Sequence, residues 1–410
     1  MNITVILPAV ITIAGLYLLF KLRFFFILHP VKTAKCFLDS MTDREARRSF
    51  FLALAGTLGV GNIFGVSAGI MIGGAGSVFW LFLSSFFSMI IKYAETLMVC
   101  ENVTDGGGMS GALPGLFKKG GKQLSLLYSA LTVVLALFMG AAIQSAAFLD
   151  VAEKSIGLNS AIGGIILLIL FLPCLIFGTD KIANITEILI PVTTILYILS
   201  CFTVILMNLP NFLPSIMLII KSALSPRAIG GGAFLIAVKE GFARGMLSNE
   251  AGMGTSSLAH SKFKHKSGTN AGIFGMYEVL FDTTLLCSLT ALTILVSVDD
   301  LDAFSTPMSL IYNAFTSRLG TGFGYVLLAM VFAFAYSTII CWYYYGYQCV
   351  RLWFFHMKPL YILAFPIFIA IPSLISQTVL LYITDLTMLV MALITIFGLL
   401  KWSKNIQSPM

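Results

Sequence analysis

Charged residues are scarce in this chain. Lys, Arg, Asp and Glu make up 10% of its 410 residues, whereas soluble domains carry about 25%. The shortage leaves little room for any soluble domain. Apolar residues make up 58% of the chain and its mean hydropathy is +0.96. They follow one another in runs of roughly 20, the length of a helix that crosses a bilayer. The sequence therefore predicts an all-α polytopic membrane protein.

Motifs of enzymes and metal sites are also missing. The chain has no HExxH motif, no cluster of Cys and His, and no paired carboxylates inside its apolar runs, so we predict that it is not an enzyme. The cysteines are scattered, mostly inside apolar runs, where a thiol behaves as a small apolar side chain. They are Cys36, Cys100, Cys174, Cys201, Cys287, Cys341 and Cys349.

The apolar runs predict about eleven membrane helices. Lys21 and Arg23 follow the first run instead of preceding it, so we interpret this run as a membrane helix and not as a cleavable signal peptide. The predicted helices are 3–28, 51–72, 77–100, 124–149, 160–178, 184–208, 229–259, 269–298, 322–350, 359–376 and 378–401.

Basic residues gather in alternate loops, which predicts the orientation in the membrane. One side holds Lys32, Lys35, Arg44, Arg47, Arg48, Lys118, Lys119, Lys122, Lys262, Lys264, Lys266, Arg351, Lys358, Lys401 and Lys404. The other side holds Asp150, Glu153, Asp299, Asp300 and Asp302. We expect a multi-pass protein of the cell membrane with its N-terminus outside and its C-terminus in the cytoplasm. This asymmetry explains the net charge of +7, so we expect contact with membrane lipid and not with nucleic acid.

Two of the apolar runs are interrupted by glycine and polar residues, at 51–72 and 229–254. An interrupted helix frees backbone N–H and C=O groups at membrane depth, which is tolerated only where they line a cavity or bind a ligand. Close helix packing is the alternative interpretation for the glycines of the first run. The second run contains Ser248, Asn249 and Glu250 in succession, which would be costly inside a packed apolar helix.

The positions of the interruptions predict an inverted repeat. Without the first helix ten remain, and the interrupted ones are the first and the sixth, which enter the membrane from opposite sides. We therefore divide the chain into an N-terminal helix with a basic loop (1–50), two five-helix repeats (51–208 and 209–401) and a cytoplasmic tail (402–410).

Several segments resemble the alanine/glycine:cation symporter family. They are GVGNIFG, GGAGSVFWLF, GTDKIANITEILIPV, GFARGMLSNEAGMGTSSLAHS and FAFAYSTIICWYYYGY, in order over roughly residues 50–350. The resemblance implies a LeuT-like fold. It also implies sodium-coupled import of a small neutral amino acid, most often alanine or glycine, by alternating access.

The resemblance also implies a site. Backbone N–H groups at the first interruption would meet the substrate carboxylate, because a helix N-terminus favours negative charge. The expected substrate contacts are Gly59, Val60, Gly61, Asn62, Gln144, Leu247, Ser248, Asn249, Ala251 and Trp342. The expected sodium ligands, all neutral oxygens, are the carbonyls of Ala55 and Leu58 and the hydroxyls of Ser337 and Thr338.

Each of these polar residues also has a structural interpretation. Gln144 is equally suited to an interhelical hydrogen bond, and the hydroxyls of Ser337 and Thr338 to bonds with their own helix. Glu250 suggests proton coupling, but we expect it to bond to freed backbone N–H groups. Glu240 and Arg244 are spaced to pair on one helix face.

The chain departs from the family at three places. Val60 stands where the family has threonine, Leu247 where it often has phenylalanine, and 105–117 lacks two tyrosines of the family. These changes leave another neutral substrate, such as glutamine or serine, as an alternative. A proton-coupled carrier, a channel and a sensor are further alternatives.

We expect His260 and His265 to be solvated in a basic loop.

Overall fold

The computed structural model describes residues 3–101, 121–177, 179–224, 232–261, 267–370, 372–401 and 403–408, and within them the regular elements are all helices. The predicted basic positions Lys118, Lys119, Lys262, Lys264 and Lys266 lie outside the described residues, as do His265 and the 105–117 segment. The side chains of Lys122 and of residues 174–187 are not described either.

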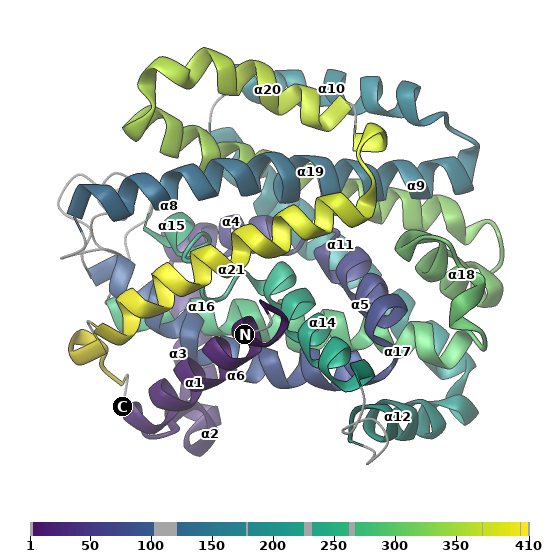
Figure 1. Cartoon of the computed structure of the whole chain (residues 1–410), viewed down its shortest axis with the longest axis horizontal. Coiled ribbons are helices and arrows are strands. Elements are labelled where there is room, and N and C mark those ends of the chain that lie inside the picture. Colours follow the sequence, from purple (N-terminus) through teal and green to yellow (C-terminus); the bar gives the residue numbers. More distant parts are fainter. Residues whose placement is uncertain are drawn as a thin grey trace.

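Figure 1 shows the helices in chain order. The first half contains α1 (Ile3–Lys21), α2 (Phe25–Leu28), α3 (Pro30–Met41), α4 (Arg44–Thr57), η1 (Gly61–Gly65), α5 (Val66–Gly73), α6 (Gly76–Glu101), α8 (Gly121–Leu135), η2 (Ala136–Ile143), α9 (Gln144–Ile156), α10 (Ser160–Phe177) and α11 (Thr179–Met207). The second half contains α12 (Leu209–Leu224), α14 (Gly232–Asn249), α15 (Ser257–His260), α16 (Gly268–Val279), η3 (Leu280–Cys287), α17 (Ser288–Ser297), α18 (Pro307–Leu319), α19 (Phe323–Trp353), α20 (Lys358–Ala370) and α21 (Gln377–Lys401). Four short 3₁₀ turns complete it: η4 (Leu301–Ala303), η5 (Phe355–Met357), η6 (Pro372–Leu374) and η7 (Ser403–Asn405).

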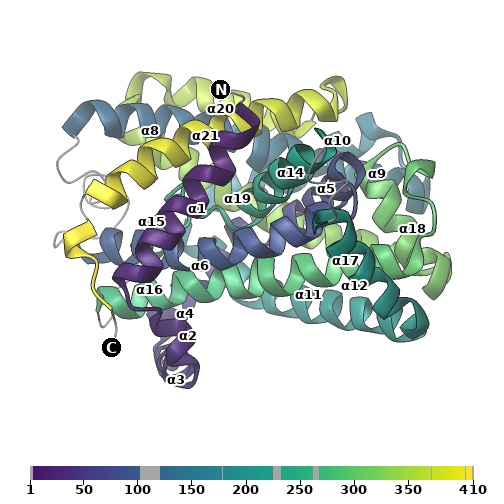
Figure 2. The ribbon, with the colours of Figure 1, turned by 60° about the horizontal axis from the view of Figure 1, so that its bottom comes forward.

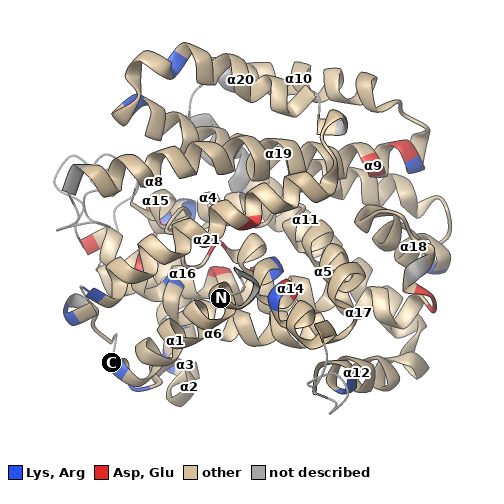
Figure 3. Cartoon of the chain, viewed as in Figure 1, with Lys and Arg blue, Asp and Glu red and all other residues tan. Residues whose placement is uncertain are grey.

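The chain is a multi-pass membrane protein. Within the described residues six helices are long and apolar enough to cross a membrane, or seven if the bent pair formed by α4 with η1 and α5 is one span. Shorter apolar helices lie at Val5–Lys21, Ser160–Pro173, Leu209–Leu224 and Phe355–Ala370. Lys, Arg, Asp and Glu are few along the helices in Figure 3, and a small group lies near the centre around α14 and α16.

The helices are arranged around α6. This helix packs against α16, α14 and α1, and α16 runs alongside it in Figure 2. α19 contacts α9, α8, α11 and α4, and α10 packs on α20 at the periphery (Figure 1). The outer face of α11 is apolar and exposed: Ile188 is 71% exposed and Val192 60%. Such a surface is suited to lipid and not to water.

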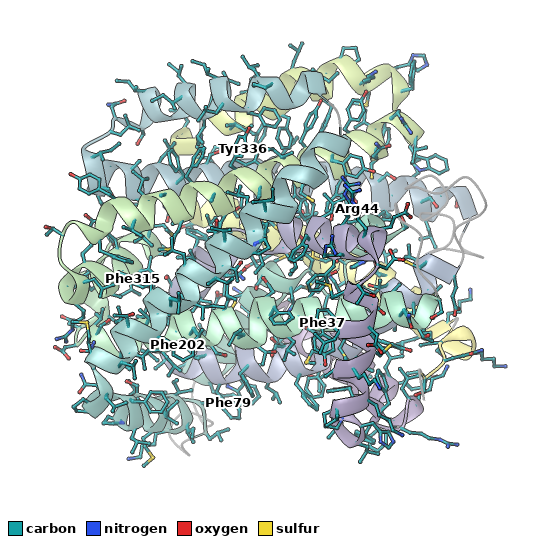
Figure 4. All side chains as sticks on the ribbon, turned by 180° about the vertical axis from the view of Figure 1, so that it is seen from behind. Phe37, Arg44, Phe79, Phe202, Phe315 and Tyr336 are labelled. Atoms are coloured by element: carbon teal, nitrogen blue, oxygen red, sulfur yellow. The ribbon has the colours of Figure 1, made fainter. Side chains whose placement is uncertain are left out.

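The N-terminal region differs from its prediction. The first helix ends at Lys21 and not at 28, because Arg23 and Phe24 take positive φ values of 54° and 53°. The predicted basic loop 29–50 is largely helical. The Phe37 ring of α3 stacks on the Tyr277 ring, with the ring centroids 4.3 Å apart. Figure 4 labels Phe37 in the view from behind.

α4 begins at Arg44, before the predicted start at 51. The side chain of Asp43 caps it by accepting hydrogen bonds from the N–H groups of Glu45 and Ala46 at 2.9 and 3.1 Å. Further along the chain, α12 and α18 were not predicted. α12 contains Pro214.

Three segments are π-helical: η1, η2 and η3. π-Helical turns are rare in proteins, and those that occur are often found at functional sites. η1 contacts η3, and Gln144, the residue that follows η2, reaches the interruption before η1. The three distortions therefore surround one place in the fold.

Candidate functional site

The first predicted interruption is present. α4 ends at Thr57, residues 58–60 leave helical geometry, and the chain resumes as η1 and α5 at 46° to α4. A side chain at Gly59 would force its neighbours to shift, because a Cβ there would lie 2.6 Å from Thr338 Oγ1 and 2.8 Å from Gln144 Oε1. Residues 58–60, called the first break below, are thus a backbone segment in close contact with two other helices.

The second predicted interruption is also present. α14 ends at Asn249, and α15 starts only at Ser257. Between them Glu250, Gly252 and Gly254 have φ values of 57°, 86° and 75°. Glycine adopts such angles readily, whereas Glu250 carries a Cβ and is strained. Strain of this kind collects at functional sites. Residues 250–256 are called the second break below.

The two interrupted helices face each other. A Cβ on Gly61 would lie 3.3 Å from the carbonyl oxygen of Leu247, and one on Gly65 3.2 Å from Leu247 Cδ2. η1 and α14 therefore touch through glycine, so the close packing weighed for these glycines exists beside the break. It also places Leu247 and Ser248 next to the first break.

Gln144 binds the first break. The N–H of Val60 donates to Gln144 Oε1 across 3.0 Å, and Gln144 Nε2 donates to the carbonyl of Met139 across 3.2 Å. The side chain is 3% exposed. Its bond is interhelical, as the structural interpretation expects, and its partner is one of the N–H groups assigned to the substrate carboxylate.

A buried polar cluster joins the two interrupted helices through Asp282 of η3. Asn62 Nδ2 donates to Asp282 Oδ1 across 2.6 Å, and Ser248 Oγ donates to Asp282 Oδ2 across 2.5 Å. The Thr283 hydroxyl donates to the same oxygen across 2.7 Å. All four side chains are at most 1% exposed.

Asn62 and Ser248 were predicted site residues, whereas Asp282 was missed. The signal for it existed, because an ionisable residue inside a membrane helix marks a functional site by default. A carboxylate with neutral oxygens around it is also a suitable set of ligands for a hard cation.

The residues expected to bind sodium come from two helices. The Thr338 hydroxyl of α19 donates to the carbonyl of Ala55 in α4 across 2.9 Å. Leu58, at the start of the first break, is 1% exposed. Ser337 donates to the carbonyl of Phe334 in its own helix across 3.0 Å. The structure thus brings Ala55 and Thr338 together, while the Ser337 hydrogen points along α19.

Trp342 of α19 contacts the second break at Glu250. Trp342 Nε1 donates to Glu250 Oε1 across 3.1 Å, and Thr255 Oγ1 donates to Glu250 Oε2 across 2.5 Å. The expectation that Glu250 bonds to freed backbone N–H groups was therefore wrong, since side chains supply these donors. The freed N–H of Ala251 instead donates to Asn249 Oδ1 across 2.9 Å.

His260 is buried and not solvated, which corrects the prediction. Its side chain is fully buried and pairs through Nε2 with Glu278 of α16, while Ser49 lies 3.3 Å from Nδ1. The basic residues that follow it in the sequence suggested a solvated loop. Lys92 of α6 was also missed: its ammonium donates to the carbonyl of Asn249, the last residue of α14, across 2.7 Å.

The predicted pair of Glu240 and Arg244 is confirmed. Arg244 Nε lies 3.3 Å from Glu240 Oε2, and its guanidinium also binds Asp385 of α21. Glu240 and Arg244 lie on α14 before the second break, whereas His260 lies on α15 after it. The interrupted helix therefore has charged contacts on both sides of its break.

The whole chain matches one protein family. The sodium:alanine symporter family covers residues 1–409. The sodium/alanine symporter AgcS of Methanococcus maripaludis is 30% identical over 315 residues, which are 74% of this chain and 69% of that protein. The probable sodium/glutamine symporter GlnT of Bacillus subtilis is 28% identical over 345 residues, or 81% of this chain and 71% of that protein. The sodium/proton-dependent alanine carrier protein of Bacillus sp. (strain PS3) is 27% identical over 313 residues, or 72% and 69%.

Solved structures show the fold. MhsT in complex with L-phenylalanine has a TM-score of 0.62 at 16% identity, over 87% of this chain and 89% of that one. A mutant of the manganese transporter of Eremococcus coleocola has a TM-score of 0.56 at 13% identity, over 86% and 76%. The fold is LeuT-like, and the predicted fold class is confirmed to that extent. The chain belongs to the sodium:alanine symporter family, the cation-coupled amino acid symporters, and is not an enzyme.

Proposed function

We propose that the protein imports a small neutral amino acid, with alanine or glycine as the first candidates, together with sodium by alternating access. The proposal also includes the topology. It has eleven membrane helices, in which two inverted five-helix repeats follow the first helix, and its N-terminus lies outside. One observation carries it: two interrupted helices face each other at a buried site that offers a backbone N–H, an amide and a carboxylate.

The substrate carboxylate binds at the first break in this proposal. The N–H of Val60 is held there by a neutral amide oxygen of Gln144, and an ionised acceptor makes a stronger bond than a neutral one. The space beside Gly59 is filled by the side chains of Thr338 and Gln144, so in this proposal the carboxylate reaches the N–H once the Gln144 side chain moves aside. The Gln144 amide then turns its donor side to the ligand.

The cationic partners bind near Asp282. The C-terminus of α14 carries partial negative charge, but Lys92 already covers the carbonyl of Asn249 there. Asp282 receives three hydrogen bonds from neutral groups, so its charge remains to be balanced by the substrate ammonium or by a sodium ion. A sodium ion at Ala55, Leu58 and Thr338 lies on the other side of the first break.

Sodium coupling supplies enough free energy for accumulation. One sodium ion that enters at a potential of about 100 mV contributes roughly 2.3 kcal/mol. A tenfold sodium gradient adds about 1.4 kcal/mol. Together they sustain accumulation of a zwitterion by roughly two to three orders of magnitude.

The test measures sodium-dependent thermal stabilisation of the purified protein against a panel of amino acids. A ligand of the folded state raises stability by RT ln(1 + [L]/Kd), so alanine, glycine, serine and glutamine each give a separate result. Uptake into proteoliposomes provides the second measurement. Uptake that is unchanged when potassium or choline replaces sodium rejects sodium coupling.

A proton as the coupling ion is the second candidate. It is favoured by Asp282, a carboxylate buried at the site with neutral hydrogen-bond donors around it. Uptake driven by a proton gradient in sodium-free buffer would support this candidate over the first.

A further inference from the structure

Five ionisable side chains form a second buried group at the second break. We call this group the inner cluster. Its members are Lys92 and Glu95 of α6, Glu250 of the second break, His260 of α15 and Glu278 of α16. Each is at most 1% exposed. Burial in a low-dielectric interior penalises every charge that lacks a partner. The net charge of this group should therefore be close to zero.

Four of the five side chains have bonded partners. Lys92 Nζ binds the carbonyl of Asn249 and lies 3.8 Å from Glu278 Oε2. His260 pairs with Glu278, which also accepts from Ser256 across 3.0 Å. Glu250 accepts from Thr255 and Trp342, as described above.

Glu95 is the exception. Neither of its carboxyl oxygens has a hydrogen-bond partner among the described residues. The Lys92 ammonium and the backbone N–H groups of Gly252 and Gly254, in the second break, lie near enough to attract it, but none of them meets hydrogen-bond geometry with its oxygens. An ionised carboxylate without donors is the most costly state that a buried carboxyl can take.

The charge count of the inner cluster also calls for a protonated carboxyl. Three carboxyls face one ammonium and one imidazole, so the group carries at least one net negative charge even when both bases are charged. Within the described residues, the other titratable groups that interact with these carboxyls add no cation: they are Asp282 on η3, Cys100 on α6, Tyr128 on α8 and Tyr345 on α19. One proton on a carboxyl is needed for neutrality.

We propose that the inner cluster is a proton-binding site and that Glu95 holds the proton. Release breaks the O–H bond of Glu95, leaves the electron pair on the carboxylate and passes the proton to water. α15 and the second break carry the buried His260 and Glu250 of the cluster, and we expect a movement of α15 to open the cluster to water. The link of this exchange to inward opening rests on the proposed transport function, whereas the presence of the proton does not.

Infrared spectroscopy of the full chain in lipid tests the proton directly. A protonated carboxyl has a C=O stretch that a carboxylate lacks, and the band shifts in D₂O. The wild type is expected to show this band from a buried acid at neutral pH, Glu95→Gln to lose it, and Glu153→Gln, which changes an exposed carboxyl, to keep it. A wild type without the band, or an undiminished band in Glu95→Gln, overturns the proposal.

A second variant covers the case in which Glu95→Gln does not fold. Glu95→Asp keeps the acid but changes its surroundings, so the band is expected to move, and an unmoved band overturns the assignment. Sodium-driven uptake measured on the same samples separates the two proposals. Sodium-dependent uptake without the band rejects only the proton site, and the band without sodium-dependent uptake rejects only the proposed function.

Discussion

The N–H of Val60 and Oε1 of Gln144 lie 3.0 Å apart, in a hydrogen bond that joins two helices 84 positions apart in the sequence. Because the N–H lies where α4 has already ended, α4 supplies no acceptor for it. The amide of Gln144 takes that role and stands where a bound carboxylate is expected.

Replacing Gln144 with alanine is expected to weaken substrate binding, because in the proposed complex the Gln144 amide donates a hydrogen bond to the substrate. A neutral hydrogen bond contributes about 0.5–1.5 kcal/mol, so the affinity should fall roughly two- to twelvefold. The measurement is the thermal stabilisation of the variant by alanine or glycine in sodium buffer. Gln123→Ala, at an exposed position on α8, is the control and should bind as the wild type does. Undiminished affinity in Gln144→Ala would contradict the proposed pocket.

Asp282→Asn is expected to impair cation-dependent binding more strongly. The substitution keeps the shape but removes the charge that accepts from Asn62, Ser248 and Thr283, and bonds to charged groups contribute about 1.5–3 kcal/mol. Sodium-dependent substrate affinity should fall by roughly one to two orders of magnitude. Asp299→Asn, at an exposed position, is the matched control. Equal loss in both variants would show that the effect is not specific to the site.

Thr338→Ala and Ser337→Ala should differ. The Thr338 hydroxyl bonds to Ala55 across two helices, whereas the Ser337 hydroxyl bonds within α19. Thr338→Ala is expected to raise the sodium concentration for half-maximal uptake about fivefold or more, and Ser337→Ala to change it little, in line with a lost neutral hydrogen bond of about 1 kcal/mol. The reverse order would place sodium elsewhere.

Gly59→Ala is expected to lower both stability and transport. Its Cβ would lie within 3 Å of Thr338 Oγ1 and Gln144 Oε1, and overpacking of a tight interior costs about 1–3 kcal/mol. The melting temperature should fall by several degrees and uptake should be lost. Gly232→Ala, where a Cβ meets nothing within 4 Å, serves as the control. A Gly59→Ala protein with full activity would show that the first break is not tightly packed in the transporting state.

Local chemistry made the interruptions predictable. Glycine beside Asn62, and Ser248 with Asn249 and Glu250 in one apolar run, conflict with a smooth membrane helix wherever the chain folds. Lys92, Glu95 and Glu278 were not predictable in the same way. Lys92 and Glu95 lie on α6 and Glu278 on α16, and only tertiary packing shows that these residues meet the second break and His260.

His260 shows the limit of sequence context. Three lysines follow it closely, which is typical of a solvated loop, yet its ring lies inside against α16. The prediction used its neighbours in sequence, and the structure depends on its neighbours in space. Asp282 differs from His260, because an ionisable residue inside a membrane helix is a signal in the sequence itself.

The three π-helical segments have a mechanical consequence. A π turn holds one residue more than an α turn, and each residue of an α-helix advances it by about 100° and 1.5 Å. If η1, η2 or η3 passed its extra residue along the chain, the helix beyond it would rotate its face without unfolding. The fold thus contains three helices around one site that could each rotate without a hinge.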